Sequence, residues 1–162
     1  MTAAFAALTL GAQSRSTSGQ KIVDQFYERH GKDFLLVNKW FAAQAIVSGE
    51  DAPARIKALI AHPDFTWTTP NRIYALLRNF IGNNFSGFHA LSGAGYELAA
   101  DAIITMDDIN PQVASRLATG FSAWRMFDMP RRAAAQKCMQ RILKKKSLSA
   151  DVYEIISRTL AV

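Results

Sequence analysis

The chain has 162 residues, of which 49% are hydrophobic and 20% charged, and its formal net charge is +6 at pH 7. This length and composition are typical of one folded globular domain with a sizeable core, and they exclude a disordered or fibrous chain. The only cysteine is Cys138, which excludes an internal disulfide and any metal site built from several cysteines. A reducing compartment, the cytoplasm, is therefore expected.

Residues 1–18 are rich in Ala, Ser and Thr and carry no acidic residue, as mitochondrial targeting segments do. Their only basic residue is Arg15, so a short amphipathic helix is favoured and mitochondrial targeting is kept as the alternative. No segment approaches the ~18 to 20 continuous apolar residues of a membrane-spanning helix, and no membrane partner is expected.

Helical periodicity then dominates the chain, and no alternating run of strand type is long enough to indicate a sheet. One helix face is formed by Ile22, Val23, Phe26, Tyr27 and His30. Asp33 is placed to cap a second helix, which carries Val37, Trp40 and Phe41 inward. Pro53 stands near the start of a third, short helix that ends at His62.

The clearest helical stripe follows Thr69–Pro70 and ends at residues 82–84. It consists of Ile73, Leu76, Leu77, Phe80 and Ile81. An irregular region comes next, in which Gly93 and Gly95 indicate a tight bend before a helix over residues 96–106.

The run Asn110-Pro111-Gln112-Val113-Ala114-Ser115-Arg116-Leu117 predicts a helix start with a polar face. Asn110 can cap the helix, and Pro111 suits the first helical position, where no backbone N–H partner is needed. Gln112 and Arg116 lie four residues apart and share an outward face. An apolar stripe begins at Val113, and this helix is expected to end near Phe127.

Two further helices complete the chain. The first restarts at residues 128–130 and runs to about Lys145, with Ala134, Cys138 and Ile142 on its apolar stripe. The last is opened by Ser147 or Ser149 and buries Val152, Ile156 and Leu160.

About 8 to 10 short helices joined by tight turns predict an all-α fold in which antiparallel helix pairs stack side by side. No tetratricopeptide or ankyrin consensus is present. The expected architecture is therefore an irregular superhelical stack, an armadillo/HEAT-like solenoid, that forms one unit over residues 1–162. Such stacks present concave faces that suit the gripping or covering of a partner.

The basic residues are dispersed except at Arg131–Arg132 and Lys144–Lys146. The lysine run falls at a predicted helix end, where cations complement the helix dipole, so a solvated helix end is favoured over a phosphate-binding patch. No aromatic platform or zinc finger accompanies these residues, and nucleic acid is not expected as a partner.

Motifs of catalysis are missing from the sequence. The three histidines, His30, His62 and His89, form no HExxH pair, and there is no GxSxG elbow or P-loop. No metal site and no catalytic residue is therefore assigned. Cys138 is interpreted as a small core residue, and His30 and His62 end helices, where an imidazole can bond to open carbonyls. His89 lies in the irregular loop, where a structural hydrogen bond is favoured over a functional contact.

Five blocks of sequence together resemble one protein family. They are VNKWFAAQA at 37–45, HPDFTWTTPNRIYALLRNF at 62–80, FHALSGAGYELAAD at 88–101, NPQVASRL at 110–117 and DVYEIISRTLA at 151–161. In this order and spacing they resemble the bacterial-type branch of aminopeptidase N, the zinc metallopeptidases with an HExxH motif. The resemblance begins at about residue 20, and residues 1–19 match poorly.

The resemblance implies that the chain corresponds to the second half of the family's C-terminal helical domain. That domain closes over a catalytic domain and leaves a chamber that short peptides enter. The zinc site, the GAMEN-type motif and the catalytic tyrosine belong to the catalytic domain, which is absent from this sequence. The chain is therefore expected not to hydrolyse peptides alone, and to hold no cofactor, with Zn in the missing domain.

The resemblance also implies a role for Gln112 and Arg116, which match the family's residues that project towards the substrate channel near the primed subsites. An amide can bond to a peptide backbone, and a guanidinium can attract a carboxylate. The structural alternative is that Arg116 pairs with a nearby acid such as Asp108.

Two other functional hypotheses remain beside that of a non-catalytic aminopeptidase domain. One is a stand-alone helical-repeat module that binds a protein or peptide, and the other is an independent enzyme, which the absence of a nucleophile with its base disfavours. A domain separated from its catalytic partner exposes apolar surface, so self-association through the first helices is expected.

Overall fold

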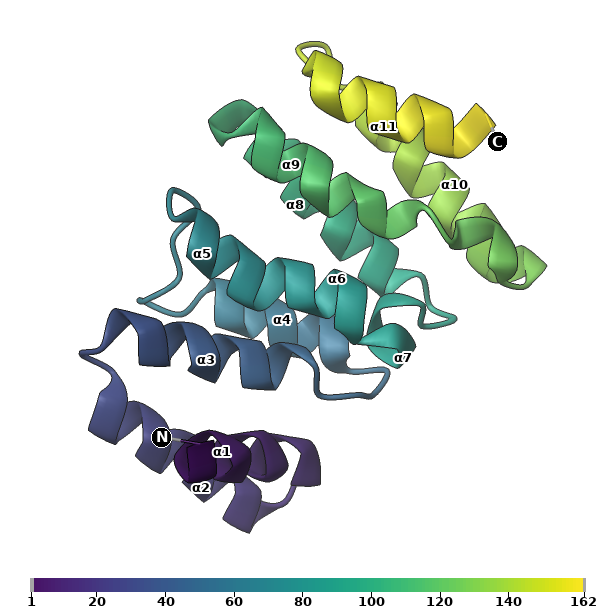
Figure 1. Ribbon diagram of the computed structural model, residues 1–162. Helices are drawn as coiled ribbons and strands as arrows, with labels where there is room; N and C mark the ends of the chain where they lie inside the picture. The colour runs from purple at the N-terminus through teal and green to yellow at the C-terminus, as the bar shows by residue number, and fades with distance from the viewer. Residues whose placement is uncertain (1, 162) are drawn as a thin grey trace.

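The structure is a computed structural model that describes residues 2–161, and within this range it contains helices and turns but no strand (Figure 1). The α-helices are α1 (Thr2–Ser14), α2 (Thr17–His30), α3 (Phe34–Ala45), α4 (Ala52–Ile60), α5 (Pro70–Ile73), α6 (Asn79–Asn83), α7 (Phe85–Phe88), α8 (Ala94–Ile109), α9 (Pro111–Ala118), α10 (Met129–Leu143) and α11 (Ala150–Ala161). A π-helical turn, η1 (Tyr74–Arg78), joins α5 to α6, so that residues 70–83 form one continuous helix. Two 3-10 turns, η2 (Thr119–Phe121) and η3 (Trp124–Met126), follow α9.

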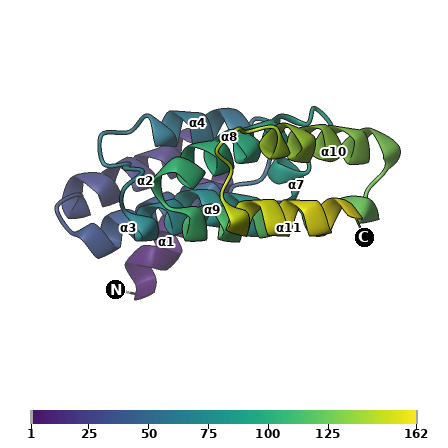
Figure 2. The same cartoon turned by 90° about the horizontal axis from the view of Figure 1, so that it is seen from above.

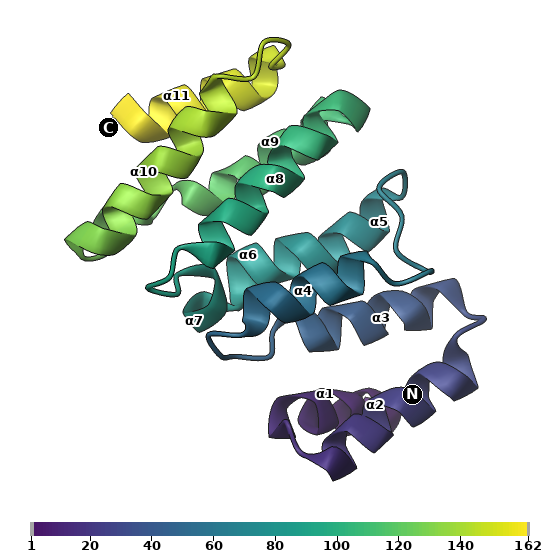
Figure 3. The ribbon, with the colours of Figure 1, turned by 180° about the vertical axis from the view of Figure 1, so that it is seen from behind.

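The helices stack side by side in two layers, as the sequence predicts for a helical solenoid. Seen from above, α4, α8 and α10 lie in one layer, and α3, α9 and α11 lie in the other (Figure 2). The continuous helix 70–83 packs against α3, and α9 packs against both α8 and α11. The view from behind shows α4, α8 and α10 in front, with the pair α1–α2 at one end of the stack and the pair α10–α11 at the other (Figure 3).

The predicted helix starts are confirmed by their capping hydrogen bonds. Asp33 caps α3, because its Oδ1 accepts the backbone N–H groups of Leu35 at 2.9 Å and Leu36 at 3.1 Å. Asp128 caps α10 in the same way through the N–H of Arg131, at 3.1 Å. Each such cap stabilises its helix by about 1 kcal/mol.

The helix from Asn110 is shorter than the sequence predicts. The α-helix ends at Ala118 instead of near Phe127, and the chain continues through η2 and η3. The 3-10 turn η2 packs closely against α6, since a Cβ on Gly120 would lie 2.0 Å from Cγ2 of Ile81. The 3-10 turns still direct Phe121 and Trp124 inward, as the apolar stripe predicts.

A cluster of aromatic rings lies where α6, α7, α8 and η2 meet. The ring of Phe88 contacts those of Phe80, Tyr96 and Phe121, with centroid distances of 6.1, 5.2 and 5.8 Å. All four side chains are fully buried. Burial of an aromatic side chain of this size stabilises a fold by about 2 to 3 kcal/mol, so this cluster is a main contributor to the core.

Gly95 allows the first turn of α8 to lie directly against α7. A Cβ at this position would lie 2.3 Å from the carbonyl oxygen of Phe88 and 2.6 Å from that of Gly87. The predicted bend at Gly93 is also confirmed, because Gly93 has a φ of +72° and α8 begins directly after it.

Gly95→Ala is expected to lower the free energy of unfolding by about 2 to 3 kcal/mol, since the new methyl group meets backbone atoms that cannot move aside. The matched control is Gly82→Ala, because Gly82 lies in α6 with no atom within 4 Å of a Cβ. The control is expected to gain about 0.5 to 1 kcal/mol through helix propensity. Denaturant unfolding of both variants measures this, and equal effects would contradict the close-packing argument.

A buried ion pair connects α8 to the loop between α10 and α11. The Asp107 carboxylate, with its side chain 0% exposed, accepts a hydrogen bond from Lys145 Nζ at 2.7 Å and others from the Ser149 backbone N–H and hydroxyl. Lys145 also pairs with Asp108 at 2.6 Å and is only 12% exposed. The prediction of a solvated lysine run is therefore wrong for Lys145, because two carboxylates at the end of α8 draw it inward.

These contacts shift the titration of Asp107. Burial alone would raise the pKa of its carboxyl, but the hydrogen bonds from Lys145 and Ser149 and the positive charge of Lys145 outweigh it and lower the pKa below 3.8. A lowered pKa in the folded state means that this stabilisation is complete above about pH 4 and is lost as the pH falls through the folded-state pKa.

Asp107→Asn is expected to lower the free energy of unfolding at pH 7 by about 2 to 3 kcal/mol, because it leaves a largely buried lysine facing a neutral amide. Asp108→Asn is the control, since Asp108 contacts the same lysine but is 63% exposed, and it should cost less than about 1 kcal/mol. Unfolding measured from pH 7 to pH 2 should show the Asp107→Asn difference shrinking below pH 4. A difference that stays constant with pH would contradict the ion-pair account.

The N-terminal pair leaves several large apolar side chains exposed. Phe5, Leu10 and Ile22 are all exposed, so Ile22 does not share the burial of the helix face on which the sequence placed it, whereas Val23 and Phe26 are buried in the core as predicted. Among the helices of the described part of the chain, none is both long and apolar enough to cross a bilayer.

Candidate functional site

The first turn of α9 has the geometry that its sequence predicts. Asn110 adopts extended backbone, and its Oδ1 accepts the N–H of Val113 at 3.1 Å. Val113 and Leu117 are buried, while Gln112 and Arg116 are exposed on the opposite face. The packing of the apolar side fixes the direction in which the polar pair points.

Arg116 makes its main contact with a residue 42 positions earlier in the chain. Its Nη1 donates a hydrogen bond to the Tyr74 hydroxyl at 2.9 Å, and its guanidinium carbon lies 5.9 Å from the centre of the Tyr74 ring. The alternative pairing with Asp108 is not formed, because Asp108 binds Lys145. The outward face of α9 thus continues onto the helix 70–83.

Tyr74 begins the π-helical turn η1. In this wider turn the side-chain amide of Asn79 donates hydrogen bonds to the backbone carbonyl oxygens of Tyr74 at 3.4 Å and Ala75 at 3.0 Å. Short π-helical segments inside α-helices occur frequently at functional sites. The turn places Tyr74 and Arg78 together, with the Arg78 guanidinium carbon 5.7 Å from the centre of the Tyr74 ring.

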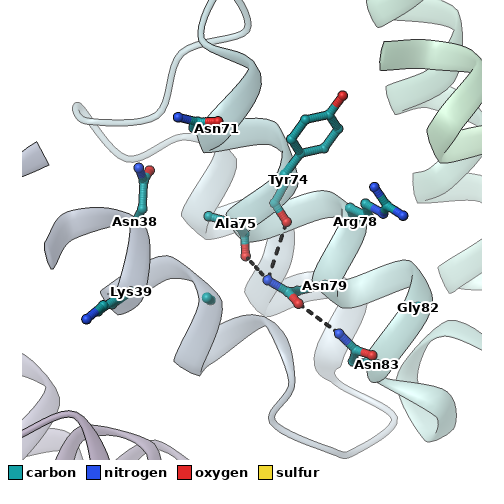
Figure 4. Close-up of a pocket in the computed structure, with 10 residues that line it drawn as sticks. Asn38, Lys39, Asn71, Tyr74, Ala75, Arg78, Asn79, Gly82 and Asn83 are labelled. Atoms are coloured by element: carbon teal, nitrogen blue, oxygen red, sulfur yellow. Dashed lines mark hydrogen bonds between the residues drawn. The ribbon is translucent and has the colours of Figure 1, made fainter. Parts of the chain in front are cut away.

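A groove of about 660 Å³ runs between α3 and the helix 70–83 (Figure 4). Its lining residues include two cations and four amides and no carboxylate. The lining residues are Asn38, Lys39, Ala42, Asn71, Tyr74, Ala75, Arg78, Asn79, Gly82 and Asn83. The Oδ1 atom of Asn38 is buried there without a hydrogen-bond partner in the described structure.

Sequence reasoning finds Gln112 and Arg116 but misses this groove. The groove depends on residues from α3 and from the helix 70–83 that come together only through helix packing. The feature of the sequence that points to the groove is the number of asparagines on the outward faces of two helices. Such a pattern does not by itself distinguish a groove from an ordinary solvated surface.

The histidines and Cys138 take structural positions. Cys138 is buried, as predicted, and burial together with the neighbouring Glu97 raises the pKa of its thiol to about 12. His62 does not bond to an open carbonyl as expected, because its Nδ1 accepts the Asp64 N–H at 3.1 Å. Within residues 2–161 no group of three or more His, Cys, Asp or Glu side chains is arranged to hold a metal ion.

His89 makes the structural hydrogen bond that the sequence favours. Its Nδ1 lies 2.8 Å from the Tyr96 hydroxyl, and its ring stacks on Phe127 with centroids 3.9 Å apart. Burial and, to a smaller extent, the charge of Arg131 lower the pKa of His89 from 6.5 to about 4. The imidazole is therefore neutral at pH 7 and belongs to the packing of the loop.

The His89 ring is expected to titrate with a midpoint near pH 4, as measured by NMR of its ring protons. Because the unfolded chain takes up this proton near pH 6.5, stability should decrease as the pH falls from 6.5 to about 4. His89→Gln should remove this part of the pH dependence. A midpoint near 6.5 would contradict the buried, neutral imidazole.

Comparison with known proteins identifies a matching family and several relatives. The family described as "Domain of unknown function (DUF3458_C) ARM repeats" matches residues 1–161. The chain is 31% identical over 160 residues to aminopeptidase N of Haemophilus influenzae, covering 99% of this chain and 18% of that protein. It is 36% identical over 141 residues to aminopeptidase N of Caulobacter vibrioides, covering 87% of this chain and 16% of that protein.

A solved structure shows the same fold. The crystal structure of Legionella pneumophila aminopeptidase A in complex with aspartic acid is similar to this chain with a TM-score of 0.88 and 34% identity. The match covers 95% of this chain and 18% of that one. The chain thus spans only 16 to 18% of the length of these relatives.

Proposed function

The chain belongs to the DUF3458_C family of ARM-repeat domains and matches the C-terminal domain of aminopeptidase N, and from this premise we propose that it is the non-catalytic part of a zinc aminopeptidase. In this proposal it closes the substrate chamber and contributes to peptide access and primed-side binding. The partner is the catalytic domain, which supplies the zinc and removes N-terminal residues from peptides.

The observation that carries the proposal is the surface formed by Gln112, Arg116 and the groove beside Tyr74. A peptide offers backbone amides and a terminal carboxylate, and this surface offers amides and guanidinium groups of matching chemistry. The lining of the groove includes no acidic side chain that would repel such a carboxylate. A surface that lines a peptide chamber needs such hydrogen-bonding and positively charged groups to contact the peptide.

The arrangement of the helices supports a covering role. The side chains assigned to peptide contact lie on α3, the helix 70–83 and α9, and each of these packs against α4 or α8 of the opposite layer. Rigid helices position contact residues accurately. The apolar side chains exposed on the N-terminal pair, Phe5, Leu10 and Ile22, offer a surface for the catalytic part and for self-association of the isolated chain.

The test combines this chain with an aminopeptidase N that has been truncated to remove the matching C-terminal segment. The truncated enzyme should cleave long unfolded polypeptides and short peptides alike, and addition of the chain should restore the preference for short peptides. Rates of release from peptides of increasing length measure this. The chain alone, with zinc and aminoacyl reporter substrates, is expected to show no turnover.

The variant Arg116→Gln should weaken the restored cleavage of short peptides, and the control Lys137→Gln, on the exposed face of α10, should not. If the chain binds the truncated enzyme without any change in length preference, the chamber-closing role is wrong. Turnover that copurifies with the folded chain would overturn the non-catalytic assignment, and lack of any binding to the enzyme would favour a stand-alone interaction module.

A further inference from the structure

A second cleft, of about 570 Å³, lies where the N-terminal pair α1–α2 meets α3 and α4 (Figure 3). Its volume is that of an ordinary small-molecule site, which encloses about 300 to 1,000 Å³. The lining combines apolar and polar residues, contains no aromatic ring and shares no residue with the groove beside Tyr74. The lining residues are Ala12, Arg15, Ser16, Thr17, Gln20, Val23, Gln44, Val47, Asp51, Arg55, Ala58 and Leu59.

The apolar part of this cleft is formed by buried aliphatic side chains. Val23, Val47 and Leu59 are each no more than 9% exposed, and all three line the cleft. They come from α2, from the loop after α3 and from α4, so the aliphatic surface is assembled from three separate segments. Since no aromatic ring is present for stacking, this surface suits a hydrocarbon chain better than a flat ring system.

Two arginines among the lining residues bind the same carboxylate oxygen. Arg15 Nη2 lies 2.9 Å from Oδ2 of Asp51, and Arg55 Nη1 binds the same atom. Arg55 is also held by the backbone, because its Nη2 donates to the carbonyl oxygens of Val47 and Ser48. With two guanidinium groups and a single carboxylate, the charged part of the lining has a surplus of one positive charge.

Arg15 is the member of this group that can exchange its partner. The side chains of Arg15 and Asp51 are both about half exposed, and an exposed ion pair of this kind contributes little to stability. If Arg15 leaves Asp51, the carboxylate still keeps Arg55 as its partner. Arg15 is therefore able to bind the carboxylate of a ligand without leaving an acid of the chain unpaired.

The backbone holds Arg15 in an unusual conformation. In the part of the chain that the structure describes, Arg15 is the only residue other than glycine with a positive φ, of +52°. It follows the end of α1, where Gly or Asn usually takes this conformation. Gly49 leaves room for the Arg15 side chain, because a Cβ there would lie 2.5 Å from Arg15 Nη1. Backbone strain of this kind is concentrated at ligand-binding and switch sites.

We propose that this cleft binds a medium-chain aliphatic carboxylate, with the carboxylate on Arg15 and the hydrocarbon chain on Val23, Val47 and Leu59. A guanidinium presents parallel N–H groups that match the two oxygens of a carboxylate. Each methylene group that leaves water adds to the affinity. None of these residues belongs to the surface assigned to peptide contact, so the inference is independent of the proposed function.

The experiment titrates the 162-residue chain with octanoate, octan-1-ol and acetate, observed by two-dimensional NMR of its N–H groups. Octanoate should cause saturable shifts at Arg15, Gln20, Val47 and Leu59. Octan-1-ol keeps the hydrocarbon chain but lacks the charge, so it should bind about three- to fivefold more weakly. Acetate has too little apolar surface to bury and should bind more than about tenfold more weakly.

Two pairs of variants separate the charge from the apolar surface. Arg15→Gln should weaken octanoate binding about three- to fivefold and leave octan-1-ol binding unchanged. Its control is Lys137→Gln, which removes an exposed cation from α10 and should change neither. Ala58→Leu fills part of the cleft and should weaken the binding of both ligands. The matched control is Ala54→Leu, because Ala54 is exposed on the same helix and does not line the cleft.

Several outcomes would overturn the proposal. If octanoate causes no saturable shifts at the cleft, or shifts only the exposed Phe5, Leu10 and Ile22, the site is wrong. Equal affinity for octanoate and octan-1-ol would contradict recognition of the carboxylate, and equal affinity for acetate would reduce the site to one for small anions. Tighter binding of N-acetylleucine than of octanoate would assign the cleft to the end of a peptide. Each of these results leaves the test with the truncated enzyme unaffected.

Discussion

The close packing of aromatic rings around Phe88 joins α7 to the helix 70–83, to α8 and to the turn after α9. Phe80 comes from the helix 70–83, Tyr96 from α8 and Phe121 from the turn after α9, and all three contact the Phe88 ring. Gly95 allows this contact, because a side chain there would meet the backbone of α7. Phe80 follows Tyr74 in the helix 70–83, and Phe121 lies in the turn that follows Arg116 and α9. The same core therefore sets the distance between Tyr74 and Arg116.

Two polar features extend this order towards the C-terminal end of the stack. The buried Asp107 carboxylate fixes the loop between α10 and α11 onto α8 through Lys145 and Ser149. Trp124 donates its indole N–H to the Thr159 carbonyl at 3.0 Å and so holds the last helix against the 3-10 turns. These bonds act in addition to apolar burial, and they place α11 beside α9 rather than leaving it as a free terminal helix.

The surface that results is chemically uneven. Some charged residues are paired within the chain, as Arg131 is with Asp128 and Lys145 is with Asp107. Arg78 and Arg116 instead contact the Tyr74 ring, as Arg72 contacts the rings of Phe34 and Phe41 and Arg125 contacts that of Trp124.

The sequence by itself determined the helices, their caps and the outward direction of Gln112 and Arg116, because these follow from local spacing and from hydrogen bonds within one or two turns. It also predicted that Cys138 is a core residue, since that depends only on the apolar stripe of one helix. The early end of α9, the inward position of Lys145 and the contact of Arg116 with Tyr74 were decided by tertiary structure alone. Each depends on which helix packs against which, and partners 37 to 42 residues apart are set by the shape of the whole core and not by local pattern.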